Sequence, residues 1–574
     1  MLKQFFPFLT WIQGYKGNFF KNDFVAGATV GVLLIPQGMA YAMIAGLPPQ
    51  YGLYAALIPQ LIYALMGTSP VLAVGPVAMD SLLVASGLGS LGIVGIENYI
   101  SAAIFLSLFM GAIQLLLGVL KMGMVVNFLS KPVINGFTSA AAIIIAVSQI
   151  KSFAGISLSN SGTFITKLVA VFSSLETVHI MTLLIGSISI VCILFLKKIS
   201  TKIPSGLILI MIALLLSYFL DLEGFGVSVI GNIPKGLPPV GIPNIEIDQI
   251  KQLFPIALTL ALIAFMEAIA VSKSFEEEQS EYEVDPNQEL VALGTANIIG
   301  SFFASYPSTG GFSRTAVNVQ AGAKTNLGAL ISMLIIGVTL LFLTPLFYYL
   351  PKAVLAAVVL VAVSGLIDVE YPKRLYQKRK DEFFLLVFTF VVTLVIGVKE
   401  GILLGVLLSI FLMIYRTSKP HIAVLGNVKG SDYYKNISRF EQDVEDREDL
   451  VIVRFDAQLY FGNKDYFKKE LFKLIDKKGK QLKAVILNAE SISHIDSSAN
   501  LMLLKLVSKL KERDVKFIIT GAIGPTRDII YSGGIVEIIG TENLFVRTSE
   551  AVCYFDSKCA PSLIQKKITQ QNKL

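Results

Sequence analysis

The amino-acid sequence predicts an α-helical polytopic membrane protein, with fourteen spans in a seven-plus-seven inverted repeat and a soluble α/β domain at the C-terminus. Three observations predict it. Of the 574 residues, 54% are hydrophobic and 16% are charged, whereas soluble globular domains carry about 25% charged residues. Before residue 420, the apolar residues form charge-poor blocks of roughly 17–22, the length that crosses about 30 Å of hydrocarbon. After Arg416 the apolar blocks shorten and alternate with amphipathic segments.

Hydropathic blocks bounded by charged residues, glycine and proline predict the individual spans. The ranges are 24–44, 51–67, 71–89, 101–120, 132–149, 178–196, 206–220, 251–272, 288–304, 310–322, 326–345, 351–367, 382–397 and 400–417. An even count places both termini on one side of the membrane. The loops on that side hold most of the Lys and Arg residues, which predicts cytoplasmic termini.

The segment from Met1 to Asp23 is aromatic and basic. It lacks the apolar stretch and small-residue cleavage site of a signal peptide, so we expect the first span to be retained. The expected location is the plasma membrane, which is the inner membrane if the source is a bacterium.

Two short spans occupy corresponding places in the two halves of the predicted transport region, 1–420. Repeat one covers about 20–220 and repeat two about 250–420, and an odd number of spans inverts the second copy. The third span opens on Ser69-Pro70 and Gly75-Pro76, and the tenth opens on Pro307-Ser-Thr-Gly-Gly311. Paired, Gly/Pro-interrupted segments of this kind are typical of a transporter's binding site.

Only three ionisable residues stand out inside the spans, and an ionisable residue in hydrocarbon is a functional-site hypothesis. Arg314 lies one turn into the tenth span, where its guanidinium can join the free N–H groups of a half-helix N-terminus and attract an anion. If the third span also begins inside the membrane, the N–H groups of Val77, Ala78 and Met79 face those of Phe312 and Ser313. The alternative for Arg314 is a structural ion pair with Glu267.

Two carboxylates are candidates for coupling. Glu267 stands alone in an apolar helix and can carry a proton, coordinate a cation or neutralise Arg314. Asp80 lies one turn into the third span, where it is either a coupling residue or a buried, hydrogen-bonded structural acid.

The first span contains a proline followed by an amide and an aromatic residue that lie one turn apart. Gln37 can donate to an anion and Tyr41 can form a wall of the cavity, although an aromatic side chain at such a position often only packs against a neighbouring helix.

The composition argues against several other functions. The cysteines Cys192, Cys553 and Cys559 and the three histidines show no metal-ligand spacing, so we expect no metal and no cofactor. We expect no enzyme, because no nucleophile–base pair is evident. The net charge of +7 is too modest to suggest nucleic-acid binding.

The C-terminal region, 421–557, is predicted to be a compact α/β domain, with a polar tail over 558–574. Expected strands are 450–455, 484–487, 515–520 and 536–539, and expected helices are 464–477, 497–513 and 525–532. Their alternation is the basis of the prediction.

Several long motifs together resemble the sulfate permease (SulP) family of anion transporters, which are relatives of prestin and pendrin, and the resemblance covers nearly the whole chain. The motifs are Gly27 to Tyr41, Pro49 to Ala55, Ser130 to Thr138, Asp285 to Leu290, Asn297 to Ser301 and Tyr306 to Asn318. The resemblance implies a core domain and a gate domain, with the substrate held between the third and tenth helices. Carried over by motif, the substrate site comprises Gln37, Tyr41, Val77, Phe312, Ser313 and Arg314, to which we add Ala78.

One departure from the family pattern bears on coupling. Glu267 matches the family's acidic position on the eighth span, but sodium-coupled bicarbonate members carry an Asp there with a Thr one turn later, where this chain has Val271. Sodium coupling of that type is therefore less favoured. Asp80 does not carry over from the family.

The C-terminal region resembles the STAS domain through Ala484 to Asn488 and Ile495 to Ala499. This resemblance aligns Ser498 with a serine that is phosphorylated in anti-sigma-factor antagonists. The alternative is that Asp496 and Ser497 cap the following helix.

We therefore expect a secondary active anion transporter that takes up sulfate by proton symport, sits in the lipid bilayer and forms the homodimer typical of the family. Alternatives are a bicarbonate or dicarboxylate transporter coupled to protons or sodium, an anion exchanger or channel, and a sensor that serves the C-terminal domain.

Overall fold

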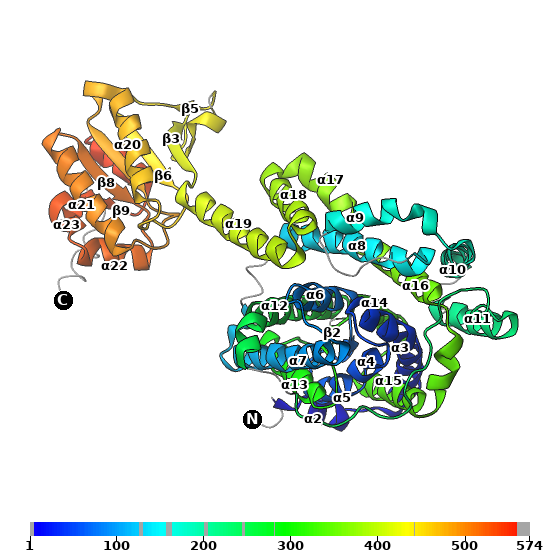
Figure 1. Cartoon of the computed structure of the whole chain (residues 1–574). Coiled ribbons are helices and arrows are strands. Elements are labelled where there is room, and N and C mark those ends of the chain that lie inside the picture. The colour runs from blue at the N-terminus through cyan, green and yellow to red at the C-terminus, as the bar shows by residue number, and fades with distance from the viewer. Residues whose placement is uncertain are drawn as a thin grey trace. The chain divides into compact units, whose positions relative to one another are not determined.

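The computed structural model describes residues 5–124, 130–156, 164–199, 205–243, 247–279, 282–440 and 442–558. The chain divides into two compact units, Met1–Ser409 and Ile410–Leu574 (Figure 1). Of the predicted polar tail, 558–574, all but Lys558 lies outside the described residues.

The first unit is helical. Its helices are α2 (Phe8–Gln13), α3 (Gly17–Ile44), α4 (Gln50–Ala55), α5 (Ile58–Met66), α6 (Ala78–Gly89), α7 (Ile96–Val119), α8 (Lys131–Ala154), α9 (Phe164–Ser173), α10 (Ile180–Ile199), α11 (Ser205–Leu220), α12 (Ile247–Gln279), α13 (Pro286–Ser301), α14 (Phe312–Gln320), α15 (Leu327–Val338), α16 (Lys352–Ser364), α17 (Glu370–Lys378) and α18 (Lys380–Val395). The boundary between the units falls within α19 (Val398–Ser418). Short 3-10 turns η2 (Leu175–Thr177) and η4 (Thr344–Tyr349), a π turn η3 (Thr339–Leu343) and strands β1 (Val74–Gly75) and β2 (Thr309–Gly310) complete the first unit.

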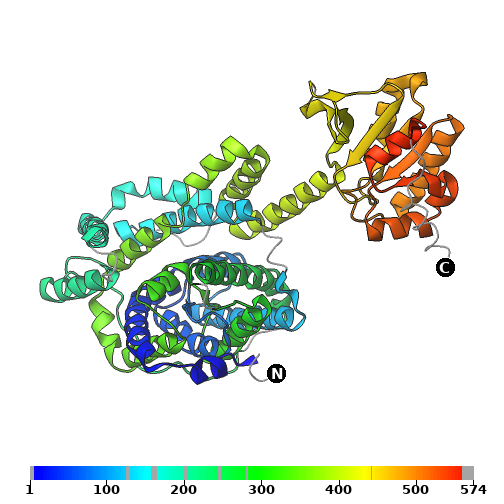
Figure 2. The ribbon, with the colours of Figure 1, turned by 180° about the vertical axis from the view of Figure 1, so that it is seen from behind.

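The helices of the first unit fall into two groups that each pack among themselves, as views from opposite sides show (Figure 1, Figure 2). Helices α3–α7 and α12–α15 form one group, in which α7 packs along α13 and α3 along α15. Helices α8–α11 and α16–α18 form the other, in which α8 packs against both α16 and α18.

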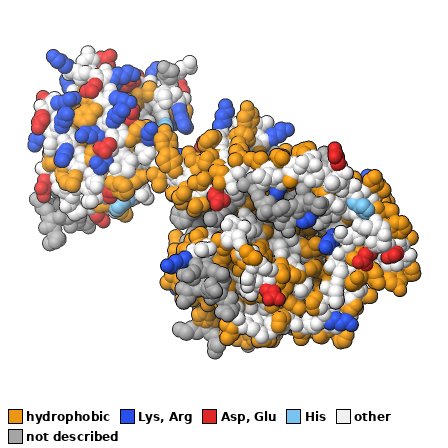
Figure 3. Space-filling model, in the orientation of Figure 1, with side chains coloured by type: hydrophobic (Ala, Val, Ile, Leu, Met, Phe, Trp, Pro, Cys, Tyr) orange, Lys and Arg blue, Asp and Glu red, His pale blue; other side chains and the backbone are white. Residues whose placement is uncertain are grey.

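Six helices of the described residues are long and apolar enough to cross a membrane by length and composition. Large apolar side chains on their outer faces are exposed, among them Leu116 and Phe342, which are 58% and 69% exposed. Orange hydrophobic side chains cover much of the face of this unit drawn in Figure 3, whereas charged side chains dot the C-terminal unit. This surface suits contact with lipid tails rather than water.

Each predicted span contains a described helix, but two differ in form. The second span is two short helices, α4 and α5, joined through Ala56 and Leu57. The eleventh begins as α15, widens into the π turn η3 and tightens into the 3-10 turn η4. Pro345 lies in the first turn of η4 and has no N–H to donate, so a regular α-helical ladder cannot continue through this turn.

The close packing of α7 on α13 depends on glycine. A Cβ at Gly111 would lie 2.6 Å from the carbonyl oxygen of Gly294, and a Cβ at Gly294 would lie 2.5 Å from the amide nitrogen of Leu115. The two backbones therefore approach as closely as small residues allow in membrane helix pairs. This contact fixes the position of α13 against α7.

The second unit is a mixed sheet of seven strands with helices on both faces. Strand order is β4-β3-β6-β7-β8-β9, with β5 also paired to β3. The strands are β3 (Ile422–Val428), β4 (Tyr434–Asn436), β5 (Val444–Glu445), β6 (Leu450–Phe455), β7 (Ala484–Asn488), β8 (Lys516–Thr520) and β9 (Leu544–Phe545). The helices are α20 (Lys464–Lys478), α21 (Ser497–Glu512), α22 (Gly524–Ser532), α23 (Ile535–Ile539) and α24 (Thr548–Phe555), with short 3-10 turns η5 (Ile437–Arg439), η6 (Gly479–Gln481) and η7 (Thr541–Asn543).

The prediction of a strand over 536–539 was wrong, because this segment lies in helix α23. The buried side chains are Ile535 and Ile539, four residues apart, while Glu537 between them is exposed. That spacing buries one face of a helical turn rather than one face of a strand. The flanking Gly534 and Gly540 both have positive φ and bound the turn.

Candidate functional site

The centre of the first unit is built around a pair of short antiparallel strands. Val74 of β1 pairs with Gly310 of β2, and Gly75 pairs with Thr309. Helix α6 begins three residues after Gly75, and α14 begins two residues after Gly310. Because the strands run in opposite directions, the two helix N-termini approach the strand pair from opposite ends. Their free N–H groups and positive dipole ends are therefore directed toward one region.

Arg314 lies in this region and is 2% exposed. Its Nη1 donates to the carbonyl oxygen of Pro76 at 2.7 Å, which ties α14 to the residue between β1 and α6. Its Nε and Nη2 are buried and have no hydrogen-bond partner within the described parts of the chain. Unpaired guanidinium donors are costly to bury, so Nε and Nη2 are each able to donate to an acceptor.

Polar side chains hold α14 against β1. The Thr315 hydroxyl donates to the Gly311 carbonyl at 2.8 Å and accepts from the Ala73 amide at 3.1 Å. One turn later, Asn318 Nδ2 donates to the Val71 carbonyl at 2.8 Å. These bonds satisfy backbone groups that short strands leave free, and they fix the helix that carries Arg314.

The two predicted carboxylates are linked electrostatically, Glu267 to the Arg314 guanidinium and Asp80 to Glu267. Asp80 is 0% exposed, and neither of its carboxylate oxygens has a hydrogen-bond partner among the residues that the structure describes. Glu267 Oε2 is likewise buried without one. The charges of Glu267 and Arg314 interact. Among the described residues, the two side chains form no direct ion pair.

The first predicted span supplies its residues from one turn of α3. Gln37 and Tyr41 follow Pro36 inside the helix and are 6% and 7% exposed. The Tyr41 hydroxyl interacts electrostatically with Arg314 and Glu267. Gln37 Oε1 has no partner within the described residues.

The residues at the two helix starts differ in exposure. Val77 and Ala78 are 4% and 8% exposed. Their side chains are apolar, so a ligand could form hydrogen bonds only with their backbone N–H groups. Phe312 is 55% exposed and its ring lies 5.7 Å from that of Phe275 on α12. Ser313 beside it is also exposed.

Two residues that the sequence did not single out also lie here. Tyr306 is fully buried, and its hydroxyl is 3.0 Å from that of Ser81 on α6. Asn297 on α13 is fully buried and bonds to the backbone of Ser308, just before β2. Both belong to the motifs that carry the family resemblance, but an uncharged polar residue gives no strong signal on its own.

Comparison with known proteins decides the family. The model of the sulfate permease family matches residues 20–389, and that of the STAS domain matches 441–551. This chain belongs to the sulfate permease family. It is therefore a membrane transporter of anions and not an enzyme.

The curated relatives of this transporter include plant proteins. It is 38% identical to "Sulfate transporter 4.1, chloroplastic" of Arabidopsis thaliana over 95% of this chain and 82% of the relative. It is 32% identical to "High affinity sulfate transporter 1" of Stylosanthes hamata over 97% and 87%.

The solved structures show the same fold. A structure of SLC26A9 matches with a TM-score of 0.89 and 24% identity, over 97% of this chain and 93% of that one. The membrane domain of the cyanobacterial bicarbonate transporter BicA matches with a TM-score of 0.59 and 23% identity, over 69% and 98%. The transporter thus has the SLC26 fold, a helical membrane domain followed by a STAS domain.

In the STAS domain, the predicted Ser498 lies in the first turn of α21, directly after the N-cap and Ser497. Asp496 is the N-cap, and its Oδ1 accepts from the Ala499 amide at 2.8 Å. Its Oδ2 accepts from the Phe461 amide at 2.8 Å. Ser497 is exposed and Ser498 is partly exposed. Asp496 therefore performs the capping that the sequence offered as the alternative role for this loop.

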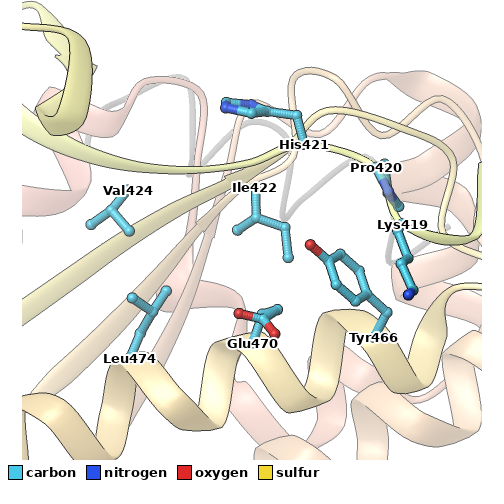
Figure 4. Close-up of a pocket in the computed structure, with 8 residues that line it drawn as sticks. All are labelled: Lys419, Pro420, His421, Ile422, Val424, Tyr466, Glu470 and Leu474. Carbon is cyan, nitrogen blue, oxygen red and sulfur yellow. The ribbon is translucent and has the colours of Figure 1, made fainter. Parts of the chain in front are cut away.

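The STAS domain also holds an open cavity of about 470 Å³ between β3 and α20. Figure 4 shows Tyr466, Glu470 and Leu474 of α20 facing Ile422 and Val424 of β3. Lys419, Pro420 and His421 complete the lining. No predicted site residue lies in it. Within the described residues, no cluster of His, Cys, Asp and Glu could hold a metal ion.

Proposed function

We propose that this transporter is a secondary active importer of sulfate, driven by proton symport, with the anion held between the N-terminal ends of α6 and α14. The observation that carries the proposal is the buried Arg314, whose Nε and Nη2 have no partner among the described residues. A guanidinium presents such donors in a planar fork that fits two oxygens of an oxyanion. The relatives named as sulfate transporters support this choice of anion.

In this proposal the site comprises Gln37, Tyr41, Val77, Ala78, Phe312, Ser313 and Arg314. The helix N-termini supply backbone N–H groups, as they do in other anion sites. Gln37 and Tyr41 close the site from α3, since both are buried and the Tyr41 hydroxyl interacts with Arg314.

Proton coupling is assigned to Glu267 and Asp80. An anion and an ionised carboxylate repel each other, so anion binding and protonation of the carboxylate favour each other reciprocally. Each carboxylate has at least one buried oxygen without a hydrogen-bond partner in the described chain. This is the environment in which a carboxyl group can gain and lose a proton as the anion arrives and leaves.

The remaining assignments follow the family. We propose cytoplasmic termini, a plasma membrane location and a homodimer, with 421–557 as a cytoplasmic STAS domain. Ser498 is a candidate for phosphorylation because it is partly exposed at the start of α21.

The proposal is tested by anion uptake into proteoliposomes, with sulfate, bicarbonate and a dicarboxylate compared, with and without sodium, and with and without an inward proton gradient. We expect sulfate uptake that the proton gradient accelerates and sodium does not. Glu267→Gln and Asp80→Asn should each weaken the acceleration, because each leaves the other carboxylate to carry a proton. Glu97→Gln, an exposed carboxylate in the first turn of α7, should keep it.

Three results would contradict parts of the proposal. A preference for bicarbonate or a dicarboxylate would change the substrate. A wild type that ignores the proton gradient would remove the symport mechanism. Uptake that simply follows the electrochemical gradient of the anion would indicate a channel.

A further inference from the structure

Asn297 binds the backbone of the chain just before strand β2 in two directions. The Ser308 amide donates to Asn297 Oδ1 at 2.9 Å, and Asn297 Nδ2 donates to the Ser308 carbonyl at 3.0 Å. Asn297 is 0% exposed. Its amide thus replaces a neighbouring strand for Ser308, whose N–H and C=O would otherwise be buried without partners.

The next residue connects the same strand to the helix that carries Glu267. The Thr309 hydroxyl donates to the Ala264 carbonyl of α12 at 2.6 Å. Ala264 lies three residues before Glu267, which is one helical turn. Gln114 of α7 joins the network, because its Nε2 donates to the Ala261 carbonyl at 3.1 Å and its Oε1 accepts from Asn297 Nδ2 at 3.4 Å. Asn297 therefore stands between the helix of the carboxylate and the strand that leads to Arg314.

The other end of α13 holds the opposite strand in a similar way. Glu289 is 0% exposed and accepts hydrogen bonds from the Thr68 amide and hydroxyl, both at 2.7 Å, and from the Tyr63 hydroxyl at 2.9 Å. Thr68 lies shortly before β1. One helix, packed tightly on α7, thus binds the segments that lead into both strands of the site.

We propose that Asn297 is a positioning residue for anion binding. It sets β2 against β1 and α12, and so determines where Arg314 lies relative to Pro76 and Glu267. The inference rests on the proposed function for the role of Arg314 in anion binding. The claim that Asn297 sets the position of β2 does not depend on that function. Asn297 touches no substrate and acts through the backbone of residues 308–314.

The test compares Asn297→Ala with Asn297→Asp and with Thr389→Val in the purified full-length protein. Asn297→Asp keeps the acceptor for the Ser308 amide and loses the donor. Thr389 is a matched control, because it is buried on α18 and, among the described residues, its hydroxyl donates to the Leu385 carbonyl of its own helix. The first readout is hydrogen–deuterium exchange over 306–316, and the second is KM and the maximal rate of sulfate uptake.

We expect Asn297→Ala to increase exchange in 306–316 while exchange in α18 keeps its wild-type rate. We expect its KM for sulfate to rise about tenfold with a much smaller change in maximal rate, the scale of losing one or two buried hydrogen bonds. Asn297→Asp should fall between wild type and Asn297→Ala, and Thr389→Val should match the wild type in both readouts.

Unchanged exchange in 306–316 would overturn the inference. So would increased exchange throughout the membrane unit with an unchanged KM, because that pattern indicates general loss of stability. If the wild type takes up no sulfate, the proposed substrate is wrong. The role of Asn297 is then decided by hydrogen–deuterium exchange together with the KM for whichever anion the wild type transports.

Discussion

The most direct prediction concerns the two free donors of Arg314. Nη1 is engaged by the Pro76 carbonyl at 2.7 Å, whereas Nε and Nη2 are buried without a partner in the described chain. Two hydrogen bonds are therefore available to a bound oxyanion. A hydrogen bond to a charged group contributes about 1.5–3 kcal/mol, so the pair contributes roughly 3–6 kcal/mol.

Two substitutions separate charge from geometry. Arg314→Lys keeps the positive charge but presents one nitrogen in place of a planar fork. It should lose about one of the two bonds, which weakens sulfate binding roughly 10- to 150-fold. Arg314→Gln loses the charge as well and should weaken binding by at least about 100-fold. The expected order of affinity is wild type, then Arg314→Lys, then Arg314→Gln.

The measurement is isothermal titration calorimetry of sulfate into purified protein that elutes as a single species. Arg374→Gln is the control, because it removes an exposed positive charge from α17, away from the strand pair. The control should bind sulfate like the wild type. If Arg314→Gln binds sulfate within threefold of the wild type, Arg314 is not part of the anion site.

Three further predictions follow from contacts. Gly311→Ala fits the backbone at φ −101° and ψ 125°, but its Cβ would lie 2.8 Å from Cζ of Arg314. Because the guanidinium must then move, calorimetry should show sulfate affinity falling about tenfold, while thermal stability stays near normal. Gly52→Ala would overlap a carbonyl oxygen of α3 and should abolish the monodisperse peak in size-exclusion chromatography. Arg447 hydrogen-bonds to Asp449 at 2.7 Å and lowers the pKa of that carboxyl, so its contribution to STAS stability is present at neutral pH and is lost as pH falls below about 4. Arg447→Met should lower the melting temperature of that domain at pH 7 by the equivalent of about 1 kcal/mol, since the pair is partly exposed, and the difference should shrink steadily as pH falls below about 4.

The membrane spans could be predicted because hydropathy and length both follow from the bilayer. What the sequence could not predict is how the chain interrupts a span. Val74 and Gly75 form a strand only because Thr309 and Gly310 lie beside them, and no local pattern reports a partner more than 200 residues away. The STAS helices were predicted better than its strands, since β3, β5 and β9 owe their structure to pairing rather than to an apolar run.

The charged residues of the candidate site could be named from rarity alone. Arg314 and Asp80 are buried, and Glu267, whose Oε2 is buried, interacts electrostatically with both. Tyr306 and Asn297 could not be named in the same way, because uncharged polar residues are common in membrane helices. Their roles depend on which backbone groups they meet, and that information exists only in the fold.

The charges of the site suggest why an anion and a proton should travel together. Each helix N-terminus contributes roughly half a positive charge and Arg314 contributes one, which sums to about +2. This matches a sulfate dianion only when Glu267 and Asp80 are both neutral. With one of them ionised, the site carries about +1 and suits a monoanion instead. Sulfate binding should therefore require proton uptake.

The double variant Glu267→Gln, Asp80→Asn tests this reasoning, because it fixes both side chains in a neutral form. We expect its sulfate affinity to be independent of pH between about 5.5 and 7.5, a range in which wild-type affinity should weaken as pH rises. We also expect it to favour sulfate over nitrate, a monoanion with no proton to exchange in that range. A double variant that still responds to pH, or that loses its preference for sulfate, would show that charge balance at these two carboxylates does not link the proton to the anion.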